Sequence, residues 1–227
     1  MLNNFYLFME IAVCFSAVVV FYKLFGKYGL ISWIAIASIM ANIITAKTSH
    51  ILGLDAAQGT VLFASTFLAT DVLCEAYGKK EARIGVLIGL GASTVLICST
   101  QIALLYMPVE YDMAHEPMAA LFALNLRITA SSMVMYIIAN LADITLFERI
   151  KTATKGRYLW VRNNVATIVC NCLENFGFIF LAFYGIYDVR TCFEIAVATS
   201  VIEIVAAVCD TPFLYLSKKV KPLINEL

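Results

Sequence analysis

Charged residues are scarce in this chain of 227 residues, because only 14% are Asp, Glu, Lys or Arg, whereas 62% are hydrophobic. Ordinary soluble domains carry about 25% charged and about 45–50% apolar residues. The formal net charge is zero, so the overall charge gives no indication of a nucleic-acid partner. This composition excludes an ordinary soluble domain and indicates a membrane protein.

The chain also has few of the residues that metal sites use. It contains two histidines, and its seven cysteines include no CxxC pair. Cys170 and Cys172 are separated by a single residue, which is too close for the usual zinc pairing. We therefore expect neither a metal site nor a cofactor.

Sequence motifs of the common hydrolases and nucleotide-binding enzymes are missing. There is no His-Glu-x-x-His, no Gly-x-Ser-x-Gly and no glycine-rich phosphate loop. Asp71 and Asp143 could in principle share a proton as paired aspartates do, but their flanking residues match no aspartyl-protease pattern. We expect that the protein is not an enzyme.

Long apolar runs are abundant. About 20 apolar residues span the hydrocarbon core of a bilayer, so these runs predict an all-α, polytopic membrane protein with seven transmembrane helices. The predicted segments are residues 5–25, 31–48, 59–77, 84–107, 121–147, 161–187 and 193–216. No room is left for a soluble domain, so residues 1–227 are expected to form a single integral membrane domain. The third segment is partly polar and could be continuous, broken or re-entrant.

Basic residues follow the odd-numbered segments, and they set the predicted orientation. Twelve of them fall on one side: Lys23, Lys27, Lys79, Lys80, Arg83, Arg149, Lys151, Lys155, Arg157, Lys218, Lys219 and Lys221. The other side has Arg190, Lys47 and an acidic loop at residues 110–116. Because cytoplasmic loops are enriched in Lys and Arg, we expect the N-terminus outside and the C-terminus inside.

A polar stripe runs along the sixth segment. Asn164, Thr167, Asn171 and Glu174 recur at spacings of 3, 4 and 3, which puts them on one face of a helix. A carboxylate at membrane depth costs a few kcal/mol unless it faces protein or water. The stripe therefore predicts that this helix lines a polar interior.

Other segments also carry polar residues at membrane depth: Asn42, Asp71, Glu75, Asn140, Asp143, Glu203 and Asp210, with Arg127 and Arg162 as the only nearby bases. A single Asn can merely join two helices. Asp71 and Glu75 could pair with Lys79, Lys80 or Arg83, and Asp210 could mark a helix break. The acids nevertheless outnumber the bases, and a buried surplus of carboxylates requires protons or a cationic ligand.

Small residues are spaced for close helix packing at Ala37-xxx-Ala41 and Gly85-xxx-Gly89. Each pair could contact another helix of the same chain or a second subunit. The intramolecular contact is favoured, and a homo-oligomer stays open.

One sequence run carries a family resemblance. Residues 67–78, FLATDVLCEAYG, resemble the F-L-x-T-D-x-x-x-E-x-Y-G signature of queuosine precursor transporters, in the vitamin uptake transporter group. Arg127 in LRITAS, Asn140 and Asp143 before Phe147, and the Arg162-Asn163-Asn164 run are similar too. The resemblance extends over residues 31–215. The family usually has Pro at Ala64, Asp at Glu174 and Thr at Asn175.

The resemblance implies import of a 7-deazaguanine (queuine, preQ1 or preQ0) through the cytoplasmic membrane, for salvage of queuosine in tRNA. It also implies a six-helix core similar to the substrate-binding subunits of energy-coupling-factor transporters, at residues 29–217, with residues 1–28 as an additional helix. Partners would be the small-molecule substrate, the lipid bilayer and, in one alternative, an ATP-driven coupling complex. The other alternative is a carrier or binding subunit for another small vitamin-like or cationic solute.

Two groups of candidate site residues follow. The substrate-binding candidates are Glu174, Asn171, Asn42, Phe67, Asp71, Arg127, Asn140 and Glu203. The gating or coupling candidates are Asp71, Glu75, Asp143, Arg162 and Asp210. Acids paired with Arg162 would form either an inner gate or a static network. Tyr136 and Phe178 could join Phe67 as an aromatic wall for a planar base. The surplus of acids favours a precursor that carries a cationic amine.

Overall fold

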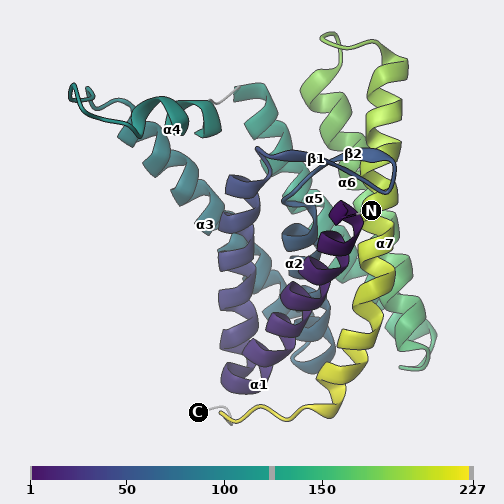
Figure 1. Ribbon diagram of the computed structural model, residues 1–227. Helices are drawn as coiled ribbons and strands as arrows, with labels where there is room; N and C mark the ends of the chain where they lie inside the picture. The colour runs from purple at the N-terminus through teal and green to yellow at the C-terminus, as the bar shows by residue number, and fades with distance from the viewer. Residues whose placement is uncertain (1, 123–125, 225–227) are drawn as a thin grey trace.

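The computed structural model describes residues 2–122 and 126–224 and is almost entirely helical (Figure 1). The elements in chain order are α1 (Leu2–Ile44), β1 (Thr48–Ile51), β2 (Leu54–Ala57), α2 (Thr60–Ala76), α3 (Lys79–Leu104), α4 (His115–Phe122), α5 (Leu126–Ala153), α6 (Leu159–Phe183) and α7 (Val189–Lys219). Within the described ranges, α1, α3, α5, α6 and α7 are long and apolar enough to cross a membrane. The expected all-α membrane protein is confirmed.

Helix α1 reverses direction at Gly26. This glycine has φ 58° and ψ −137°, which no helical residue adopts, and the chain descends before it and ascends after it (Figure 1). Phe21 and Trp33 then meet edge to face across the bend, with ring centroids 5.4 Å apart. The two halves of α1 correspond to the first two predicted segments.

A short β-hairpin follows the second half of α1. Segment 31–48 was predicted to stay helical to Thr48, but the helix ends at Ile44 and Thr48 begins β1, so the predicted end is wrong by four residues. The strands pair antiparallel around Leu52 and Gly53, which both have positive φ, as a two-residue hairpin turn requires. Asn4 Oδ1 accepts a hydrogen bond from Leu52 N at 3.0 Å, so the hairpin is held to the start of α1.

Helix α2 is the central element. It runs unbroken from Thr60 to Ala76, so the third segment is continuous rather than broken or re-entrant. Thirteen of its 17 residues are buried, and it packs against α1, α3, α5 and α7. Its polar side chains therefore face protein, which explains how a partly polar segment can lie inside the bundle.

The fifth predicted segment, 121–147, differs from the structure at both ends. Its first residues belong to α4, residues 123–125 lie outside the described part, and α5 continues to Ala153. Helix α3 reaches the bundle through Gly85 and Gly89. A Cβ at Gly89 would lie 2.6 Å from Tyr136 Oη and 2.8 Å from Ile34, so only glycine allows this approach. The Gly85-xxx-Gly89 contact is therefore intramolecular, as predicted.

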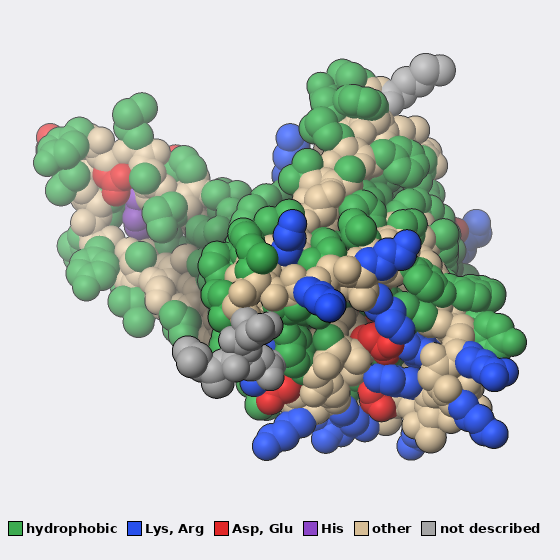
Figure 2. Space-filling view, turned by 90° about the horizontal axis from the view of Figure 1, so that it is seen from below, with side chains coloured by type: hydrophobic (Ala, Val, Ile, Leu, Met, Phe, Trp, Pro, Cys, Tyr) green, Lys and Arg blue, Asp and Glu red, His purple; other side chains and the backbone are tan. Residues whose placement is uncertain are grey.

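One end of the bundle gathers the basic residues. The Gly26 bend, the α2–α3 and α5–α6 turns and the end of α7 all lie at the bottom of Figure 1. Lys and Arg side chains are spread across this face when it is viewed from below (Figure 2). We call it the basic end. The charge asymmetry predicted from the sequence is thus a property of the folded molecule.

Candidate functional site

A column of buried polar side chains runs through the bundle between α2, α5, α6 and α7. Ionisable residues are almost never fully buried in proteins unless they are paired. Besides Ser and Thr residues whose hydroxyl groups bond to their own helix, ten polar residues of these four helices have at most 6% of their surface exposed: Asp71, Asn140, Asp143, Arg162, Asn163, Thr167, Asn171, Asn175, Glu203 and Asp210. We call this set the polar column. Together with Glu75 and its lysine partners at one end and Glu174 towards the other, it forms three layers.

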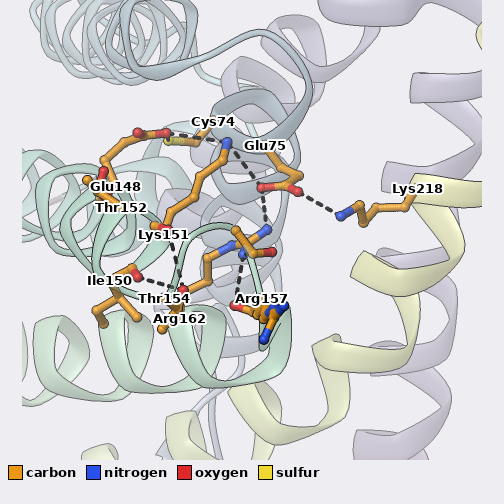
Figure 3. A network of polar contacts seen from close by, with 11 residues as sticks. Cys74, Glu75, Glu148, Ile150, Lys151, Thr152, Thr154, Arg157, Arg162 and Lys218 are labelled. Carbon is orange, nitrogen blue, oxygen red and sulfur yellow. Dashed lines mark hydrogen bonds and ion pairs between the residues drawn. The ribbon is translucent and has the colours of Figure 1, made fainter.

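The first layer lies at the basic end and centres on Glu75 (Figure 3). Its carboxylate contacts Arg162 at 2.6 Å, Lys218 at 2.8 Å and Lys151 at 3.2 Å. These bases come from α6, α7 and α5, whereas Glu75 belongs to α2. A single carboxylate thus connects four helices, and we call these four residues the Glu75 cluster.

Arg162 is fixed within this cluster by its surroundings. Its guanidinium donates to the carbonyl oxygens of Gly156 at 3.1 Å and Arg157 at 3.4 Å, and it lies 5.3 Å from the ring centroid of Phe147. The side chain is fully buried. Arg162 pairs with Glu75, and in the described residues it forms no ion pair with the aspartates of the proposed gate. The local pairing of Glu75 with Lys79, Lys80 or Arg83 is likewise replaced by bases from other helices.

The second layer contains three aspartates, one or more turns further from the basic end. Asn163 Nδ2 donates to Asp210 Oδ1 at 2.5 Å, and Thr167 Oγ1 donates to Asp71 Oδ2 at 3.4 Å. Asp143 lies against Asp71 and Thr167. Within the described part of the chain, Asp71 Oδ1 and both carboxyl oxygens of Asp143 accept no hydrogen bond. This layer therefore has acceptors in excess of donors.

The third layer lies towards the opposite end and also has an excess of acceptors. Asn175 Nδ2 donates to Glu203 Oε2 at 2.7 Å, and Glu203 is close enough to act electrostatically on Glu174. Glu174 Oε2, Asn171 Oδ1 and Asn140 Oδ1 are buried, and no described donor reaches them. Buried acceptors are normally satisfied, so this group suits a ligand that brings several N–H donors.

Aromatic rings stand beside the column. Phe67 is fully buried and Tyr136 is 8% exposed, and Phe63 contacts both, with centroid distances of 5.6 and 5.8 Å. Phe178 instead packs at 6.1 Å from Phe183 in a separate apolar cluster. Two of the three aromatic candidates are thus joined through Phe63, which the sequence did not single out.

Two predicted site residues, Asn42 and Arg127, form hydrogen bonds outside the polar column. Asn42 is exposed, and its amide donates to Ser38 O at 2.7 Å and to Ser93 Oγ at 3.2 Å, which joins α1 to α3. Arg127 is also exposed, and it donates to Leu181 O at 2.7 Å and to the carbonyl of the residue after α6 at 2.8 Å. Basic side chains commonly cap helix C-termini in this way.

Four residues of the column and its end were not selected from the sequence. Asn163 and Asn175 bond to Asp210 and Glu203 across the antiparallel pair α6 and α7, so only the register of that pair identifies them. Lys151 and Lys218 counted only towards orientation. Both follow their segments by a few residues, and the helices extend far enough to bring them to Glu75.

Comparison with known proteins assigns this arrangement to a family. A family model described as "Putative vitamin uptake transporter" matches residues 57–217. A protein of Bacillus subtilis named "Probable queuosine precursor transporter" is 34% identical over 221 residues, which cover 97% of this chain and 96% of the relative. The "Queuosine precursor transporter" of Escherichia coli is 24% identical over 165 residues, or 70% of this chain and 71% of the relative. No solved structure matches the chain.

Proposed function

Because this chain belongs to the vitamin uptake transporter family, whose relatives include queuosine precursor transporters, we propose that it imports a queuosine precursor. The members are transporters rather than enzymes, and this protein is a multi-pass membrane protein. Within the proposal, the protein lies in the cytoplasmic membrane. The two halves of α1 and helices α2, α3, α5, α6 and α7 make seven crossings, with the basic end in the cytoplasm.

The single observation that carries the proposal is the set of buried, unpartnered acceptors on Asn140, Asn171 and Glu174. The edge of a 7-deazaguanine presents a ring N–H beside an exocyclic amine. A carboxylate can accept from two adjacent N–H donors, and an Asn side chain can pair with a mixed donor and acceptor edge. We assign Glu174 to the ring and amine donors, and Asn171 and Asn140 to the remaining polar positions.

Phe67 supports this location of the substrate. It is fully buried on α2, and its contact with Phe63 continues to Tyr136 on α5. A planar base requires an aromatic or apolar surface against which to stack. We therefore propose that the base binds between α2, α5 and α6. Asn42 and Arg127, by contrast, are assigned to helix packing rather than to the substrate.

The charge of the carboxylates near the proposed binding site suggests which precursor is imported. Glu203 lies near Glu174, and in the described residues neither forms an ion pair with a base. PreQ1 and queuine carry an amine that is cationic at neutral pH, whereas preQ0 carries a neutral nitrile. Two neighbouring carboxylates favour the cationic precursors. The same carboxylates would also suit another small cationic or vitamin-like solute, which is the second candidate function.

We also propose a domain organisation. Residues 29–217 would form a six-helix core related to the substrate-binding subunits of energy-coupling-factor transporters, and residues 1–28 would add a helix to it. If the protein works as such a subunit, uptake stops when the energising ATPase is removed. Uptake that survives this removal excludes the ATP-driven complex.

The function is tested in a strain that cannot make queuosine precursors. The gene is expressed, preQ0, preQ1 or queuine is fed separately at a low concentration, and queuosine in tRNA is measured. We expect restoration with preQ1 or queuine, and loss of restoration in Glu174→Gln. Glu194→Gln is the matched control, because Glu194 is an exposed glutamate 62% accessible on α7. Absence of restoration with all three precursors contradicts the proposed function.

A further inference from the structure

The three aspartates of the second layer have no counter-ion among the described residues. Arg162, on the neighbouring helix α6, is a fully buried base, but its ion pair is with Glu75. Lys151 and Lys218, which are partly exposed, also pair with Glu75. The bases at this end of the column therefore pair with Glu75 and Glu148, and none of these ion pairs includes one of the three aspartates.

Hydrogen bonds to the three aspartates are unequal. Asp210 accepts a hydrogen bond from Asn163, and one carboxyl oxygen of Asp71 accepts a hydrogen bond from Thr167. Asp143 is fully buried and accepts no hydrogen bond from the described chain, although it lies against Asp71. Two carboxyl groups in contact inside a protein do not both ionise, because like charges repel and neither is hydrated. One proton between Asp71 and Asp143 removes both problems, since it converts one carboxyl into a donor for the other.

The described residues around this pair offer no other positive charge to compensate for the carboxylates. The titratable groups next to this pair are Cys74 on α2, Cys170 on α6 and Asp210 on α7, none of which is a base. Helices α1 and α3 also pack on α2, and they join Lys27 to Glu81 at 3.9 Å. No described group of three His, Cys, Asp or Glu residues could hold a metal ion. A proton is thus the ligand that this pair suits.

We propose that the Asp71–Asp143 pair is a proton site and that import of the precursor is coupled to movement of this proton into the cell. This inference rests on the proposed function for its transport step. The proton binds from the outer side, is carried by the carboxyl pair, and leaves to water at the basic end. No bond of the substrate forms or breaks.

The structure indicates both a route and a mechanical consequence. Glu75 is one helical turn from Asp71 on the same face of α2, and Lys218 beside it is 45% exposed, so the Glu75 cluster connects the pair to water. Loss of the proton places two negative charges against each other on α2 and α5. Their repulsion favours separation of these helices, which line the proposed substrate site.

The proton itself is tested by infrared spectroscopy of the purified protein at neutral pH. A protonated carboxyl group gives a C=O stretching band that shifts in heavy water. We expect Asp71→Asn with Asp143→Asn to remove one carboxyl equivalent from this band, whereas Glu194→Gln leaves it unchanged. A band of equal intensity in the double variant and the wild type overturns the inference, whatever the substrate is.

Coupling is tested in proteoliposomes with the membrane potential held at zero. An inward proton gradient of one pH unit should drive about tenfold accumulation of labelled preQ1 or queuine for one proton per substrate. Asp143→Asn, which mimics the protonated form, should still exchange labelled for unlabelled precursor but lose accumulation. Exchange without gradient-driven accumulation in the wild type overturns the coupling and leaves the proposed function intact. Absence of exchange with every precursor contradicts the proposed function, and the infrared result then decides the proton site by itself.

Discussion

Replacement of Glu75 by Gln should destabilise the protein more than replacement of an exposed glutamate such as Glu194. The variant keeps the size of the side chain but removes the carboxylate that Arg162, Lys151 and Lys218 share. Arg162 is fully buried, so its charge is left without a partner. Removing one member of a buried ion pair costs about 3–5 kcal/mol. The two lysines are partly exposed and add at most about 1 kcal/mol each.

The measurement is the free energy of unfolding in mixed micelles of a mild and a denaturing detergent. Glu194→Gln is the control, because Glu194 pairs with Arg190 at 2.9 Å on the exposed surface of α7, and its loss should cost less than about 1 kcal/mol. A double-mutant cycle with Arg162→Met then isolates the pairwise interaction between Glu75 and Arg162. Met is neutral, so this variant leaves no unpaired charge in the interior at position 162. If Glu75→Gln costs no more than Glu194→Gln, the cluster does not hold the four helices together.

Three further predictions concern binding, packing and orientation. Glu174→Gln should weaken equilibrium binding of the precursor by about 1.5–3 kcal/mol through loss of a charged hydrogen bond, and unchanged affinity in a folded protein would move the site elsewhere. Gly89→Ala should destabilise the protein by about 1–3 kcal/mol in the same unfolding assay, because its Cβ would overlap neighbouring side chains, whereas Gly91→Ala, with nothing within 4 Å, should be neutral or stabilising; equal effects would refute the close contact. Reporter proteins fused at the C-terminus and within residues 112–116 should report the cytoplasm and the outside respectively, and a shared compartment would contradict the proposed crossings.

The helical segments could be predicted because an apolar run needs no partner to be recognised. The ends of those segments could not, since they depend on tertiary contacts. Nothing in the sequence stops the second segment at Ile44, because the next residues, Thr45, Ala46 and Lys47, are all compatible with a helix. The hairpin that follows is held by Asn3 and Asn4 near the start of the chain, and such a contact has no local signal.

The polar column was predictable along each helix but not between helices. Helical spacing correctly put Thr167 and Asn171 on a buried face. Asn42 is exposed and donates to Ser93 Oγ of α3, a partner that spacing along α1 alone could not identify. The partners of Glu75 come from three other helices, so they depend on how those helices pack. Spacing within one segment carries no information on that packing.

The position of α2 has a consequence for how the protein is synthesised. Ribosomes deliver α2 to the membrane long before α5, α6 and α7, yet these later helices carry the basic partners of Glu75 in the described part of the chain, and α7 also packs against α2. Until Lys218 is made, the newly inserted α2 exposes two carboxyl side chains without their final neighbours. Co-translational insertion must therefore keep α2 at the translocon or in a hydrated position. The carboxyl groups of α2 are fully shielded from lipid only after the last helix, α7, has been inserted.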